Sequence, residues 1–161
     1  MKYLYAALAA AFTLTAMAQT PSTAKSDCNE LLNAAIPLAE QLLEMHGEFY
    51  PYGAAMKPDG EIVSVAADNG EEHPHSAPLI AGLKGALHNE ASKGAYKATA
   101  IVYDVRVIPP GATEKTDAIA VALDHQDHYS VVVYFPYHLQ DSKLTLGNAF
   151  ANAGEASIFP R

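Results

Sequence analysis

The sequence predicts an α+β domain: an antiparallel sheet of five to six strands with two main helices, in the order α-β-β-α-β-β-β. Apolar residues recur at helical spacing in two stretches. Residues 96–108, 117–124 and 128–135 instead predict three long strands, and in the last two both faces carry apolar side chains. Because a strand with one face in water alternates with polar residues, both faces of this sheet must be covered. We therefore expect one helix on each face, with the C-terminal segment or a dimer contact covering what remains.

The first helix is predicted over residues 27–46. Asp27 and Glu30 have the spacing of a capping box, and Gly47 follows the last residue of the apolar pattern. Pro37 lies inside this stretch and has no amide hydrogen to donate. We expect the helix either to kink there or to restart with Pro37 in its first turn.

A hairpin and a second helix follow. Two strands, residues 49–57 and 61–67, are joined by Pro58-Asp59-Gly60, in which glycine supplies the positive φ that such turns need. Ser76 is the expected cap of the second helix, and Gly94 its end. After the three long strands, residues 144–146 and 157–159 are predicted to add one or two short strands.

The N-terminal residues 1–18 have the organisation of a secretory signal peptide. Lys2 precedes a short apolar run, and Ala16-Met17-Ala18 offers the small residues that signal peptidase requires. We expect cleavage before Gln19, a flexible segment over residues 19–26, and one domain over residues 27–161. The protein is then periplasmic or secreted, and it has no membrane association after cleavage.

Charge and motifs narrow the function further. The net charge of −8 disfavours nucleic acids and anionic membranes and favours a basic partner, although acidity also serves solubility alone. Cys28 is the only cysteine, so no intramolecular disulfide forms. The sequence contains no G-x-S-x-G, P-loop or G-x-G-x-x-G motif. An enzyme is thus the less favoured class, and we assign no catalytic residue and no cofactor.

Four residues are candidates for binding a ligand or partner. Tyr50 and Tyr52 share one face of a strand, and such tyrosines are common at interfaces, although ordinary strand filling also explains them. Asp104 and Arg106 also share a face within an apolar strand. They are a structural ion pair, exposed residues at the edge of the sheet, or the polar end of a ligand pocket.

Histidines give the alternative of a zinc site. His125 and His128 are close enough in sequence to supply two ligands, and Asp124 or Asp127 would supply a third. A surface turn rich in aspartate and histidine explains the same residues without a metal.

Two segments carry a resemblance to known proteins. Residues 47–53 (GEFYPYG) and residues 103–111 (YDVRVIPPG), with Lys115-Thr116-Asp117, look like segments of small bacterial proteins of uncharacterised function. The order of elements is similar to that of profilin-like and roadblock-like domains. The resemblance implies an α/β sandwich on an antiparallel sheet, and no activity.

These observations favour an exported, non-catalytic protein that binds a protein or peptide partner or a second copy of itself. An immunity protein against a basic exported toxin is one form of this hypothesis. The alternatives are a metal-binding protein or metal-dependent hydrolase using His125 and His128, and a small-ligand sensor with a pocket near Asp104 and Arg106.

Overall fold

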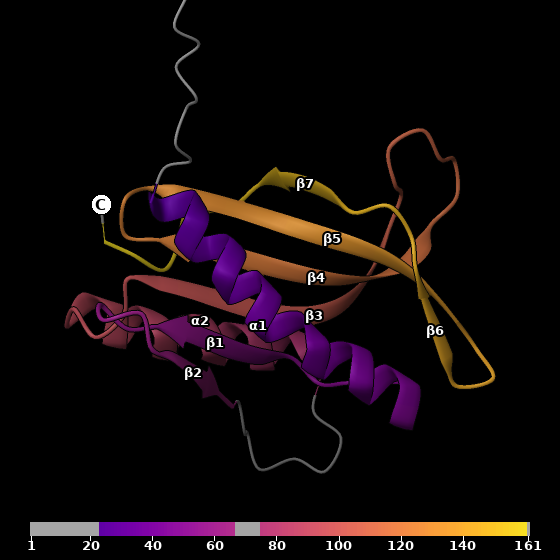
Figure 1. Cartoon of the computed structure of the whole chain (residues 1–161), viewed down its shortest axis with the longest axis horizontal. Coiled ribbons are helices and arrows are strands. Elements are labelled where there is room, and N and C mark those ends of the chain that lie inside the picture. The colour runs from indigo at the N-terminus through magenta and orange to yellow at the C-terminus, as the bar shows by residue number, and fades with distance from the viewer. Residues whose placement is uncertain (1–22, 67–74, 161) are drawn as a thin grey trace, which may run out of the picture.

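The computed structural model describes residues 23–66 and 75–160, and these form two helices and one antiparallel sheet of seven strands (Figure 1). The predicted α+β class is confirmed. The elements in chain order are α1 (Thr23–His46), β1 (Tyr52–Met56), β2 (Ile62–Val65), α2 (Ser76–Ser92), β3 (Ala98–Val107), β4 (Thr116–His125), β5 (Tyr129–Gln140), β6 (Lys143–Leu146) and β7 (Phe150–Ala153).

The strand order across the sheet is β2-β1-β3-β4-β5-β6, and β7 also pairs with β5. The long strand β5 therefore has two partners on its outer side: β7 pairs with residues 131–134, and β6 pairs with residues 137–140. The predicted hairpin is confirmed as β1 and β2, whose turn contains Gly60 at φ 94°. Among the described residues, no helix has the length and apolar character needed to cross a membrane.

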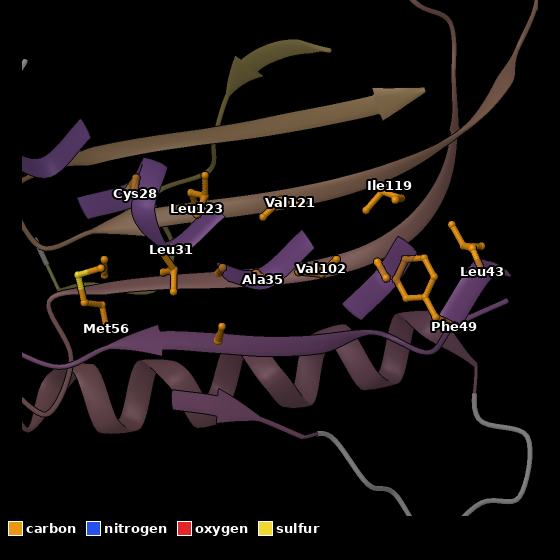
Figure 2. Packing of buried hydrophobic residues seen from close by; sticks show 14 residues of the cluster. Cys28, Leu31, Ala35, Leu43, Phe49, Met56, Val102, Ile119, Val121 and Leu123 are labelled. Atoms are coloured by element: carbon orange, nitrogen blue, oxygen red, sulfur yellow. The ribbon is translucent and has the colours of Figure 1, made fainter. Parts of the chain in front are cut away.

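One helix covers each face of the sheet, as predicted. In Figure 1, α1 runs diagonally across the front of the sheet and α2 lies behind it. Leu31, Ala35 and Leu43 of α1 are buried against side chains of the sheet such as Val102 and Val121 (Figure 2). This layer is the larger part of the hydrophobic core.

The second layer lies between α2 and the other face of the sheet. Leu83 and Leu87 of α2 pack there with Ala55 and Ile101. Ile158, which follows the end of β7 in the sequence, is buried in the same cluster. The C-terminal segment, residues 154–160, therefore helps α2 to cover this face.

Both helices begin differently from the prediction. Helix α1 starts at Thr23, so residues 23–26 of the segment predicted to be flexible are helical, and Asp27 lies inside the helix instead of capping it. The Asp27 carboxylate instead contacts Lys97 and His125. In α2, Ser76 is the first helical residue; His75 stands at the cap position and makes no side-chain capping bond. The predicted signal peptide, residues 1–18, lies outside the described residues.

The final strand also differs from the prediction. Residues 143–146 form β6 as expected, but β7 is formed by residues 150–153 and not by residues 157–159. The backbone N–H groups of Ser157 and Ile158 instead donate hydrogen bonds to the side chain of Asp124. These two N–H groups therefore bind a carboxylate in place of the backbone carbonyl groups of a neighbouring strand.

Candidate functional site

Three alanines of β4 leave a shallow depression on the face of the sheet towards α2, because their side chains are small. Ala118, Ala120 and Ala122 alternate along β4 and therefore share one face. Ala120 is fully buried, whereas Ala122 is only half-buried. The side chains beside them on the neighbouring strands are larger: Tyr103 and Tyr134 flank Ala120, and Ile101 and Val132 flank Ala122.

A groove of about 190 Å³ lies over Ala122, between α2 and the C-terminal segment. We call it the α2 groove. Its walls are mostly apolar, and its lining includes Ile80, Ile101, Val132 and Ile158. A protein cavity of about 150 Å³ holds a benzene molecule, whereas sites for drug-sized ligands start at about 300 Å³. The α2 groove thus has room for one ring or one extended side chain.

The Asp124 carboxylate also lines the α2 groove, two residues along β4 from Ala122 and therefore on the same face of the sheet. Its Oδ2 atom accepts hydrogen bonds from the N–H groups of Ser157 and Ile158, each at 3.1 Å. The residue is only 8% exposed. Two further bonds anchor the same segment: Ala156 N–H donates to Ser130 Oγ at 3.0 Å, and His88 Nδ1 donates to the Ile158 carbonyl at 2.7 Å. The carboxylate is therefore held in place before any ligand arrives.

An exposed ion pair is part of the lining of the groove. Lys84 Nζ on α2 lies 2.6 Å from Glu155 Oε2 on the C-terminal segment, and the hydrogen bond from Lys84 lowers the pKa of Glu155. The two side chains are 38% and 75% exposed. Exposed ion pairs contribute little stability, so this pair can open at small cost. Tyr103 also lines the groove, and burial raises the pKa of its hydroxyl, which stays protonated.

Of the two candidate tyrosines, Tyr52 has a structural role. Its hydroxyl donates to the Ala35 carbonyl at 2.7 Å and accepts from Ala39 N–H at 3.0 Å. It thus links these two groups of α1, which flank Pro37, and α1 continues past the proline without restarting. Tyr50 is 42% exposed and does not line the α2 groove. The structure does not bring these tyrosines together with the groove.

Asp104 and Arg106 do not pair with each other. Arg106 Nε lies 3.3 Å from Asp117 Oδ1 on the neighbouring strand, and both side chains are exposed. Tyr137 donates its hydroxyl to Asp104 Oδ1 at 3.1 Å. Burial raises the pKa of Asp104, although the Tyr137 hydrogen bond opposes this effect. Neither Asp104 nor Arg106 lines the α2 groove, so the pocket predicted near them is not the site described here.

His125 and His128 do not form the predicted pair of metal ligands. Asp127 N–H donates to His125 Nδ1 at 3.0 Å, so the proton is on Nε2, which donates to Asp27 Oδ2 at 3.2 Å. Both ring nitrogens of His125 are thereby occupied, and His128 is exposed in the turn at φ 60°. Within residues 23–66 and 75–160, no three His, Cys, Asp or Glu side chains are grouped to hold a metal ion. The zinc alternative stays a prediction.

The His125 contact belongs to a buried polar cluster that local sequence patterns do not reveal. Lys97 Nζ also lies 3.0 Å from Asp27 Oδ2. Burial alone would raise the pKa of Asp27, but hydrogen bonds from Lys97 and His125 outweigh it and lower that pKa. The cluster joins the first turns of α1 to β4 and to the start of β3.

Cys28, next to this cluster, is not an activated nucleophile. The side chain is 1% exposed, and burial raises the pKa of its thiol to about 12. Because a nucleophilic cysteine needs a lowered pKa or an adjacent base, Cys28 acts as a small apolar core residue.

Comparison with known proteins found that no family model, no curated protein and no solved structure matches this chain. The resemblance noted from the two sequence segments stays a prediction.

Proposed function

We propose that this protein is an exported binding protein without catalytic activity, and that it takes one side chain of a partner into the α2 groove. The observation that carries the proposal is the construction of the groove. An apolar floor and walls surround a carboxylate that the C-terminal segment already holds in position. Preformed apolar sites with a few fixed polar groups are typical binding sites.

The size of the groove favours a partner's side chain over a free metabolite. A volume of about 190 Å³ is filled by one anchor residue, and single buried anchors supply much of the free energy of many protein interfaces. Exposed polar groups also line the groove, because its lining includes Lys84 and Glu155. An apolar centre with a polar rim is the usual anatomy of such an interface.

The remaining reactive residues support a non-catalytic role. The Cys28 thiol is protonated and buried, and the two ring nitrogens of His125 are both hydrogen-bonded. Export is inferred from residues 1–18 of the sequence, with their charged start, apolar run and small residues before Gln19.

A groove-filling variant tests the proposal. Ala122→Leu places a larger side chain in the half-buried floor of the groove, whereas Ala151→Leu changes an exposed position of β7 outside it. The bait proteins are wild type and both variants, and the exported fraction of the producing cell is the source of partners. We expect wild type and Ala151→Leu to retain the same partner, and Ala122→Leu to lose it although its thermal unfolding stays cooperative. Equal retention by Ala122→Leu, or no retained partner, would contradict the proposal.

A further inference from the structure

We infer that the side chain received by the α2 groove is cationic, a lysine or arginine of a basic partner, with its charged end at Asp124. This inference rests on the proposed function, because it specifies the chemistry of the same groove. It depends on three features: the acceptor capacity left on Asp124, the balance of charge around the groove, and the apolar path that leads to the carboxylate.

Asp124 has acceptor capacity that residues 23–66 and 75–160 do not use. An ionised carboxylate has roughly four lone-pair positions. The two N–H groups of Ser157 and Ile158 both donate to Oδ2. Asp124 lines the groove, and only 8% of the residue is exposed. A cation placed there would meet a fixed acceptor in surroundings of low dielectric, where charge-assisted hydrogen bonds are strong.

The charge around the groove favours a cation. Lys84 is the one cationic residue among the described residues that line it, and Glu155, at 2.6 Å, neutralises Lys84. Asp124 then leaves the lining with a net negative charge. The whole chain has a net charge of −8, which attracts basic partners over longer distances.

The shape and polarity of the groove fit a basic side chain better than a purely apolar one. The methylene stem of lysine or arginine would lie over Ala122, between Ile101 and Val132, with the charged end beyond it. A neutral apolar occupant of the same length would exclude water from Asp124 and offer no donor in return. Leaving a buried carboxylate poorly paired is costly, so the groove discriminates against such an occupant.

Two probes of equal shape test the inference. N-butylguanidinium imitates an arginine side chain, and N-butylurea has the same shape without the charge. Each is titrated into the isotopically labelled mature protein, and the NMR signals of Ala122, Val131 and Val132 are followed. We expect N-butylguanidinium to bind about tenfold more tightly than N-butylurea, as for one charge-assisted hydrogen bond. This comparison uses wild-type protein, so it needs no variant to fold.

Two variants then test whether Asp124 causes the tighter binding of N-butylguanidinium. Asp124→Asn keeps a carbonyl oxygen for the Ser157 and Ile158 N–H groups and removes the charge, and the Ile158 amide signal reports whether the segment stays docked. Asp141→Asn is the matched control, since Asp141 is exposed in the turn between β5 and β6 at φ 51°, which asparagine tolerates. We expect Asp124→Asn to abolish the tenfold preference and Asp141→Asn to keep it.

The outcomes separate the two proposals. Equal binding of both probes at the groove would overturn the cationic specificity and leave the proposed function standing. Shifts of either probe that persist in Ala122→Leu would show binding elsewhere and contradict both. A guanidinium preference that Asp124→Asn retains, with the Ile158 amide signal unchanged, would assign the charge recognition to another residue and overturn the inference.

Discussion

Tyr52 shows how a single hydroxyl supports an element that contains a proline. Pro37 supplies no amide hydrogen, and on either side of it the Ala35 carbonyl and the Ala39 N–H are both hydrogen-bonded to the Tyr52 hydroxyl. The tyrosine therefore belongs both to the backbone pairing of α1 and to the packing of α1 against the sheet.

Tyr52→Phe removes only this hydroxyl. It leaves the Ala35 carbonyl and the Ala39 amide without their partner, and we expect the free energy of unfolding to fall by about 1 to 3 kcal/mol. Tyr129→Phe is the control, because Tyr129 packs against the same core and its hydroxyl makes no hydrogen bond among the described residues. Urea denaturation measures both, and an equal effect of the two substitutions would contradict the role of Tyr52.

Asp27 gives the protein an acid-sensitive contact. Its pKa is lowered in the folded state, so between that pKa and the ordinary value of 3.8 the unfolded chain binds more protons. The stability from this group is complete above the ordinary pKa and is lost as the pH falls through the folded pKa. Lys97 and His125 lose their charged acceptor at that point.

We expect Asp27→Asn to lower the free energy of unfolding at neutral pH by about 1.5 to 3 kcal/mol, as for hydrogen bonds to a charged group. The difference from wild type should shrink as the pH falls from about 5 to about 2.5. Urea denaturation over this range measures it, with Asp141→Asn as an exposed control. A difference that is independent of pH would show that the Asp27 charge does not contribute.

At the scale of elements, the C-terminal segment depends on a close backbone approach. A Cβ atom added at Gly154 would contact Ser130 Oγ and would lie 2.8 Å from the Val131 backbone nitrogen. The Val131 nitrogen belongs to the β5 backbone and has little freedom to move. Glycine is therefore required where the chain leaves β7 and turns towards α2.

Gly154→Ala should loosen the C-terminal segment, with faster amide exchange at Ser157 and Ile158 and a loss of stability of about 1 to 3 kcal/mol. Gly85→Ala is the opposite control, because nothing lies within 4 Å of a Cβ at this exposed position of α2. There we expect a gain of about 0.5 to 1 kcal/mol from helix propensity. Hydrogen exchange and urea denaturation check both, and unchanged exchange at Ile158 in Gly154→Ala would contradict the close approach.

The elements also show what local sequence patterns can predict. The helices, the hairpin and the three long strands were predicted because their periodicity and turn residues are local. The α2 groove could not be predicted in this way, because its far wall is a segment without periodicity that is held by Asp124, 33 and 34 residues away in sequence.

Distance along the chain also explains the error at Asp27. The spacing of Asp27 and Glu30 imitates a capping box, but the His125 partner lies 98 residues away. Two charge-assisted hydrogen bonds from the sheet outweigh a single capping bond. Of the six residues predicted for sites, Tyr52, Asp104, Arg106 and His125 have described contacts within the fold, and none of the six lines the α2 groove.

For the whole molecule, export predicts a defined mature start. We expect protein recovered from the exported fraction to begin at Gln19, because Ala16 and Ala18 provide the small residues before the cleavage site. Intact-mass measurement shows the start directly. Ala18→Arg should block processing, whereas Gln19→Asn should not. Recovery of uncleaved chain from the cell interior would contradict export.

The borders of the sheet have a consequence for its solubility. The edge strands are only four residues long: β2 on one side of the sheet, and β6 and β7 on the other. The twelve-residue strand β5 is paired with both β6 and β7 on its outer side. Long, straight edge strands expose unpaired backbone groups, and strands of other molecules can pair with them. Fibrils grow by such pairing. In this fold, the short edge strands offer few unpaired backbone groups to a strand of another molecule. We therefore expect concentrated protein to resist fibrillation for as long as the short outer strands stay paired.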